Sequence, residues 1–145
     1  MASVREILAA KGSQVLSIGP DATALDAAVL MNEHKVGCLL VLDAGKVAGV
    51  FSERDLMHSI VVPRRDAAQT PVREVMSTEV VCCQPHTTIE EARGVMKNRR
   101  IRHLPVLDGD GRLCGMVSIG DLNAWQSNEH EQTIQVLTDY IYGRN

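Results

Sequence analysis

Two short motifs in this 145-residue sequence carry the side chains best suited to chemistry. Each reads Gly-h-h-Ser-x-x-Asp, where h is apolar, with Ser52 and Asp55 in the first copy and Ser118 and Asp121 in the second. A glycine before a strand-to-helix turn lets a ligand approach the backbone, and the helix start offers free N–H groups to a phosphate. The serine adds a hydroxyl, and the aspartate can accept hydrogen bonds from the two vicinal hydroxyls of a ribose. The motif predicts a site for a nucleoside phosphate.

The same spacing is also typical of a capping box. In a capping box the serine side chain accepts a hydrogen bond from a helix N–H, and the acid accepts one from the serine backbone. On the motif alone, capping is the simpler interpretation. Two details favour a ligand, because a capping box prefers Glu or Gln as its acid and because the glycine has no part in capping. Both interpretations stay open at the level of the sequence.

The motifs belong to a longer internal repeat. Residues 4–8 correspond to 72–76, and residues 41–43 correspond to 106–108. Each copy has roughly 60 residues and would be only marginally stable alone, so we expect the copies to share a core. The expected division is a first repeat at 1–62, a linker at 63–71, a second repeat at 72–127 and a C-terminal amphipathic helix at 128–145.

Each copy is expected to form a strand, a helix, two strands and a helix. Thr23-x-x-Asp26 and Thr88-x-x-Glu91 are typical of helix caps, and each is followed by apolar residues at helical spacing. In each copy, two apolar runs joined by Asp and Gly predict a hairpin. The expected strands are 15–18, 38–42 and 47–51 in the first copy and 103–107 and 113–117 in the second.

Composition excludes several classes of function. A net charge of −3 and an aromatic content of 3% argue against nucleic-acid binding, which needs a basic surface or stacking rings. No apolar run approaches the roughly 20 residues of a membrane span, and charges interrupt the first apolar stretch, unlike in a signal peptide. We therefore expect a cytoplasmic protein that binds neither a membrane nor nucleic acid.

No catalytic or metal-binding arrangement can be argued from residue spacing. There is no nucleophile beside a base, no Walker loop and no His/Cys spacing typical of a metal site, so we expect neither an enzyme nor a metal. Of the four cysteines, Cys38 and Cys114 lie in apolar runs and are expected to be buried reduced thiols. Cys82 and Cys83 could form a thiol sensor, although one of the two should face inward because strand neighbours alternate.

The chain resembles a tandem pair of cystathionine β-synthase (CBS) domains, known as a Bateman module, over nearly its whole length. The resemblance rests on the two motifs, on the Pro-x-x-Thr helix entries and on residues 102–108, Arg-His-Leu-Pro-Val-Leu-Asp. Residues 133–143 further resemble small stand-alone bacterial CBS-pair proteins. The resemblance implies an α+β fold of two βαββα units in a pseudo-twofold arrangement with packed sheets, followed by a C-terminal helix. It also implies a homodimer.

The resemblance further implies two clefts between the repeats that bind AMP, ADP, ATP, NAD(H) or S-adenosylmethionine. The aspartates would hold the ribose, the serines would lie near phosphate, and the adenine would lie between backbone and apolar side chains. The candidate ligand-binding residues are Ser17, Ile18, Leu39, Ser52, Arg54, Asp55, Val81, Arg102, His103, Leu104, Pro105, Ser118, Ile119, Gly120 and Asp121.

The two candidate sites are not expected to be equivalent. Arg54 lies in the first motif where the second has Gly120, and residues 102–103, Arg-His, replace the Gly-Cys of residues 37–38. Leu40 stands where the family usually has a proline, which Pro105 keeps. One site could therefore be empty or prefer a different ligand.

Two functions follow. The first is a non-catalytic regulatory module that binds adenosine-containing nucleotides and senses energy or redox-cofactor levels in signal transduction. The alternative is a ligand-free dimerisation or docking module that regulates a separate enzyme or transporter.

Overall fold

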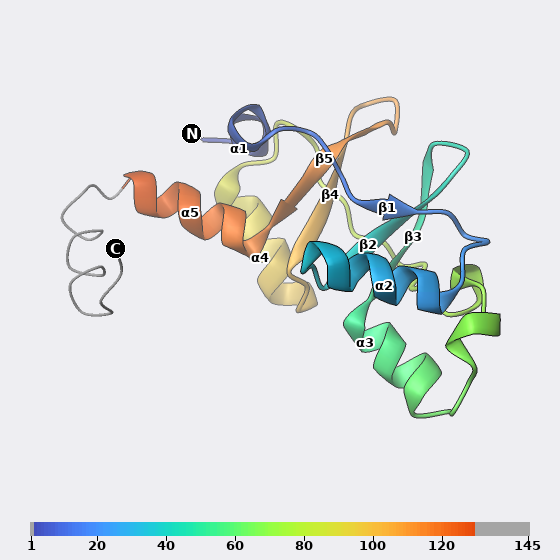
Figure 1. Cartoon of the computed structure of the whole chain (residues 1–145). Helices are drawn as coiled ribbons and strands as arrows, with labels where there is room; N and C mark the ends of the chain where they lie inside the picture. The colour runs from blue at the N-terminus through green and yellow to red at the C-terminus, as the bar shows by residue number, and fades with distance from the viewer. Residues whose placement is uncertain (1, 130–145) are drawn as a thin grey trace, which may run out of the picture. The chain divides into compact units, whose positions relative to one another are not determined.

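The computed structural model describes residues 2–129, which form two small sheets with helices around them (Figure 1). The expected α+β class is confirmed. Of the C-terminal helix expected at 128–145, the residues after Glu129 lie outside the described residues. Between residues 2 and 129, no helix is both long enough and apolar enough to cross a membrane.

The described residues fall into two compact units that do not follow the repeat boundaries. Unit 1 contains residues 2–13, 82–110 and 114–129, and unit 2 contains residues 14–81 and 111–113. The N-terminal segment of the first repeat thus belongs to the same unit as most of the second repeat. Segment 72–81 of the second repeat belongs in turn to unit 2.

Unit 2 contains a three-stranded sheet in the order β1-β2-β3. Strand β1 (Ser17–Ile18) runs parallel to β2 (Cys38–Asp43), which forms an antiparallel hairpin with β3 (Lys46–Ser52). The hairpin turn has positive φ angles at Ala44 (51°) and Gly45 (81°), as expected for a two-residue turn that matches the twist of its strands. The hairpin expected in the first copy is confirmed.

The helices of unit 2 begin and end where local chemistry predicts. Helix α2 (Ala24–His34) starts at the capping box of Thr23 and Asp26 and ends at Lys35, which has a left-handed conformation. Ala24, Ala27 and Met31 of α2 pack in a core with β2, β3 and later segments. Those segments are α3 (Glu53–Leu56), the π-helix η1 (Met57–Val61) and the 3-10 helices η2 (Ala67–Gln69) and η3 (Val72–Glu74).

Unit 1 repeats the general order of these elements but differs in its sheet and in the form of its helices. It contains α1 (Val4–Lys11), α4 (Ile89–Arg99), the sheet of β4 (His103–Leu107) with β5 (Leu113–Ser118), and α5 (Ile119–Glu129). In the described part of the second copy, the first strand is reduced to a single parallel bridge between Cys83 and Val106. Helix α4 contacts α5 through bonds from the Arg93 guanidinium to Asn123 and Gln126.

Backbone hydrogen bonds join residues 4–8 to unit 1 and residues 72–76 to unit 2. We call these two matching segments the leading segments of the first and second repeat. In unit 1, the N–H of Val4 donates to the carbonyl of Thr87 at 2.9 Å. In unit 2, the N–H of Val72 donates to the carbonyl of Ala22 at 2.8 Å. Lys11 and Ser77 come shortly after the two leading segments, and each contacts the motif aspartate of the other repeat.

Candidate functional site

The first motif lies at the junction of β3 and α3. Ser52 caps α3: its Oγ accepts from the Asp55 N–H at 3.2 Å, and its own N–H donates to Asp55 Oδ2 at 2.9 Å. The Ser52 hydroxyl also donates to Asp55 Oδ2 at 3.1 Å. The second carboxylate oxygen, Asp55 Oδ1, accepts a bond from the Ser77 hydroxyl at 3.1 Å. Both motif side chains are half-buried.

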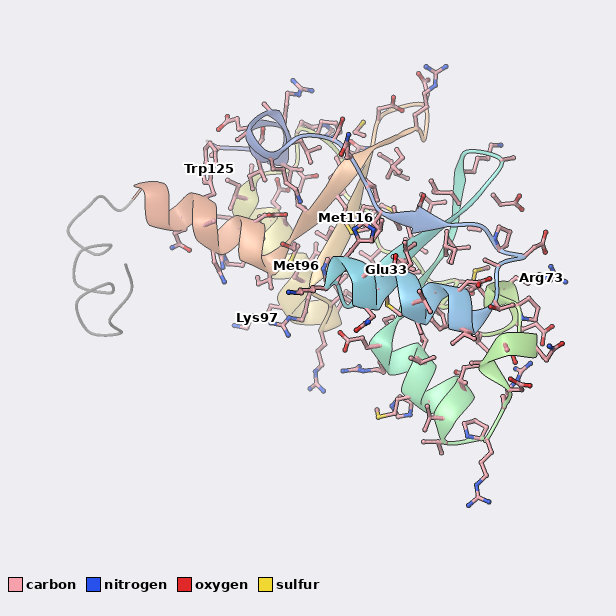
Figure 2. All side chains as sticks on the ribbon, viewed as in Figure 1. Glu33, Arg73, Met96, Lys97, Met116 and Trp125 are labelled. Atoms are coloured by element: carbon pink, nitrogen blue, oxygen red, sulfur yellow. The ribbon has the colours of Figure 1, made fainter. Side chains whose placement is uncertain are left out.

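The second motif has the same capping geometry but a different partner. The Ser118 N–H donates to Asp121 Oδ2 at 2.8 Å, and the Asp121 N–H donates to Ser118 Oγ at 3.1 Å. The Lys11 ammonium forms an ion pair with Asp121 Oδ2 at 2.7 Å and donates to the carbonyl of Met116 on β5 at 3.0 Å (Met116 is labelled in Figure 2). Asp121 thus has a cationic partner where Asp55 has a hydroxyl.

The capping interpretation of the motif is confirmed in both copies. It does not use up the carboxylates, because two carboxylate oxygens together can accept about four hydrogen bonds. In the second motif, all the described bonds go to Oδ2. A ligand hydroxyl can therefore still bind Oδ1 of Asp121, while at Asp55 it would share Oδ1 with Ser77 or replace it.

The motif glycine has a packing role that the sequence did not reveal. A Cβ added to Gly49 would lie 2.7 Å from the backbone oxygen of Ser77 and 2.8 Å from the Met76 sulfur. A Cβ on Gly115 would lie 2.8 Å from the Leu8 side chain. In both copies the absence of a side chain at the glycine lets the leading segment of the other repeat pack closely against the strand. The sequence had suggested instead that a ligand approaches closely there.

Lys11 and Ser77 contact the motif aspartates, and sequence analysis named neither of them. Lys11 is 110 positions from Asp121, and Ser77 is 22 positions from Asp55. No local motif marks either residue. The one available signal was the repeat itself, because both residues come shortly after matching segments, 4–8 and 72–76.

The surroundings of Asp121 are rich in basic groups. Burial alone raises the pKa of this carboxyl, but the Lys11 ammonium and the Ser118 N–H outweigh it, so the pKa lies below its usual value. Burial lowers the pKa of His103, with the Asp121 charge opposing this shift and Arg102 and Lys11 adding to it. These groups together make the uncharged form of His103 more favourable than it is for an exposed histidine.

The remaining predicted residues of unit 1 lie within the second motif or on the segment that begins β4, which is hydrogen-bonded to the start of α5. The carbonyl of Arg102 accepts a bond from the Ile119 N–H at 2.9 Å, which joins the start of β4 to the start of α5. Leu104 and Pro105 follow on β4 and are buried, so little of either residue is open to a ligand. Gly120 is exposed.

In unit 2, the predicted residues are spread over the sheet and the start of α3. Ser17 and Ile18 pair with β2, and Leu39 is fully buried in the core. Arg54 is exposed beside Asp55, while Val81 is half-buried in a segment that forms neither helix nor strand.

Cys82 and Cys83 do not have the properties of reactive thiols. Burial raises the pKa of Cys83 to about 11, and the neighbouring Cys82 adds to this shift. Burial also raises the pKa of Cys82. Because the thiolate is the reactive form, these shifts argue against a thiol sensor at this pair. Cys83 is buried, as expected for one member of the pair.

The described residues hold no group of three His, Cys, Asp or Glu side chains suited to a metal ion. Unit 2 has a hollow of about 380 Å³ between the end of α2 and the start of α3. Val36, Glu53 and Leu56 are among its lining residues, whereas Ser52 and Asp55 are not. The hollow is therefore separate from the serine and aspartate of the first motif.

Comparison with known proteins gives one consistent result. The family model for the CBS domain matches residues 4–62 and 72–128. The CBS domain-containing protein YhcV of Bacillus subtilis is 39% identical over 130 residues, which cover 89% of each chain. The mitochondrial CBS domain-containing protein CBSX3 of Arabidopsis thaliana is 34% identical, with 97% of this chain and 72% of that protein covered. A solved protein with CBS domains from Burkholderia ambifaria is 37% identical with a TM-score of 0.85, covering 92% and 99% of the two chains.

Proposed function

This chain belongs to the CBS domain family as a tandem pair, and on that premise we propose that it is a sensor of adenosine-containing nucleotides. CBS-pair proteins of this kind are non-catalytic modules of regulation and signal transduction. The proposed ligands are AMP, ADP, ATP and NAD(H), with S-adenosylmethionine as a further candidate. The protein would then report on energy or redox-cofactor levels to a separate enzyme or transporter.

The observation that carries this proposal is the duplicated, half-buried aspartate at a helix start. Asp121 keeps an oxygen beyond the one used in capping, and Ser118 lies at the same helix start, where an anion is favoured. A CBS domain protein of Pyrobaculum aerophilum was solved in complex with AMP. At 24% identity the two proteins are similar in fold. AMP binding by this chain is therefore part of the proposal.

A thermal-shift screen with AMP, ADP, ATP, NAD, NADH and S-adenosylmethionine tests the proposal. AMP has about 23 non-hydrogen atoms, and roughly 0.3 kcal/mol per atom corresponds to a micromolar-range Kd. At a ligand concentration one hundred times Kd, the protein should gain about 2.7 kcal/mol, which raises Tm by roughly 5–10 °C. The double variant Asp55→Asn with Asp121→Asn is the control and should show a clearly smaller shift, because each substitution weakens binding at its own motif. If none of the six compounds raises Tm, the sensor proposal is wrong.

A dimerisation or docking module is the second candidate, favoured by an apolar surface on unit 2. Leu25, Val29 and Val36 expose 37–47% of their surface on and beside α2, and the hollow beside α3 adjoins Val36. The side chains on and after η1 are more exposed still, at 50–67% for Met57, Val61 and Val62. We propose that this surface pairs with a second copy of the chain to form a homodimer. A neighbour of the same fold, a CBS-CP12 protein, is described as hexameric.

Replacing Val29 with Glu is expected to convert a homodimer into a monomer, because a charge would be buried in an apolar interface. The measurement is molar mass by light scattering across a range of protein concentrations. The matched control is Lys97→Glu on α4, an exposed position of the second copy. An unsubstituted protein that is monomeric throughout, or a Val29→Glu variant that stays dimeric, would contradict this surface assignment.

The cytoplasm is the proposed compartment. None of the four cysteines, all of which lie within residues 2–129, forms a disulfide, and reduced thiols are typical of proteins in a reducing environment. The net charge of −3 gives no general attraction to anionic lipid or nucleic acid.

A further inference from the structure

We propose that Lys11 makes the Ser118–Asp121 motif selective for a phosphorylated nucleotide over uncharged adenosine, by donating a hydrogen bond to the ligand's phosphate. This inference rests on the proposed nucleotide-binding function and adds a residue from a distant part of the chain. Under it, the two motifs differ in the charge of the ligand that each prefers. Ser118 and Asp121 would still bind the ligand as described above.

The first step of the argument is that Lys11 is held in place. Its ammonium donates to Asp121 Oδ2 at 2.7 Å and to the carbonyl of Met116 at 3.0 Å. A lysine ammonium can donate three hydrogen bonds. Within residues 2–129 the Lys11 ammonium donates the two just given, so one N–H remains for a ligand. The Lys11 side chain is 38% exposed, so a ligand can reach part of it. An ammonium already ordered by two acceptors loses little further freedom when it binds a third.

The second step is the position of Lys11 relative to the motif. Lys11 Nζ and the Ser118 N–H both donate to the same oxygen, Asp121 Oδ2. The ammonium therefore lies within a few ångströms of the helix start where the serine hydroxyl is found. A nucleotide with its ribose on Asp121 Oδ1 would place its first phosphate in this neighbourhood. A charge-assisted bond of this kind is stronger than a bond between neutral groups.

The third step is the contrast with the first motif. Asp55 has the neutral Ser77 hydroxyl at 3.1 Å where Asp121 has Lys11. The residue after Ser52 is the acidic Glu53, whose N–H bonds to the carbonyl of Gly37. The corresponding carbonyl in the second motif belongs to Arg102, a basic residue. The charges around the second motif thus favour an anion more than those around the first, even with Arg54 counted beside Asp55.

The test is a set of calorimetric titrations with AMP and with adenosine. An Asp55→Asn background weakens binding at the first motif, so that the tighter binding event reports on the second motif. Lys11→Met is compared with Lys11→Arg in that background. We expect Lys11→Met to weaken AMP binding about tenfold or more and to change adenosine binding less than about twofold, with Lys11→Arg keeping most of the affinity for AMP. Lys97→Met, which removes an exposed lysine from the same unit, should change neither.

Each other result has a separate meaning. Equal weakening of AMP and adenosine would show that Lys11 only positions Asp121, and tighter binding of both would show that Lys11 competes with the ligand. Either result, or no change, overturns the role of Lys11 and leaves the nucleotide-binding proposal standing. If the unsubstituted protein binds neither compound, nor any other member of the thermal-shift panel, the proposed function fails and this inference fails with it.

Discussion

An Asp121→Asn variant is expected to bind nucleotide about 10- to 100-fold more weakly at the second motif and normally at the first. An amide replaces one acceptor oxygen with a donor and removes the negative charge that strengthens bonds from ribose hydroxyls. A hydrogen bond to a charged group contributes about 1.5–3 kcal/mol, which is the source of this range. Asp55→Asn should show the reverse pattern. Calorimetric titration with AMP measures both.

The matched control separates ligand binding from helix capping. Asp26 forms the same capping box with Thr23, with its Oδ2 accepting from the Thr23 N–H at 3.0 Å, but it is outside both motifs. Asp26→Asn should therefore weaken its own helix cap and leave both binding events intact. If Asp55→Asn and Asp121→Asn behave like Asp26→Asn, the aspartates serve only as caps and the site assignment is wrong.

Replacing Gly49 with Ala is expected to lower the free energy of unfolding by about 1–3 kcal/mol, which is the usual cost of overpacking a tight contact. The new methyl group would lie 2.7 Å from the Ser77 carbonyl oxygen, a backbone atom that cannot move alone. Val50 and Ser77 exchange two backbone bonds of 2.9 Å, and these would have to lengthen or break. Because the Ser77 hydroxyl bonds Asp55, the change should also reach the first motif.

Gly94→Ala in α4 is the control for this prediction. A Cβ at Gly94 meets nothing within 4 Å, so alanine should stabilise the helix by about 0.5–1 kcal/mol. The two variants thus change Tm in opposite directions, which urea or thermal unfolding followed by circular dichroism can measure. A Gly49→Ala variant as stable as the original protein would show that the leading segment does not pack closely on β3.

The local elements could be predicted because their signals lie a few residues apart. Thr23 with Asp26 and Thr88 with Glu91 cap their helices as the spacing indicated. The Asp-Ala-Gly-Lys segment forms the expected turn between β2 and β3. The first strand of the second copy was the exception, because β1 and its counterpart depend on pairing with a distant strand and the second copy keeps only the Cys83 bridge.

The candidate site was predicted in part for the same reason. The sequence alone determined that a serine and an aspartate meet at a helix start in each copy, because hydrogen bonds between residues i and i+3 follow from helix geometry. Only the tertiary structure decided what each aspartate meets: the Lys11 ammonium at Asp121 and the Ser77 hydroxyl at Asp55. These partners depend on which repeat each leading segment packs against. That packing joins residues far apart in the sequence, so no local sequence pattern predicts it.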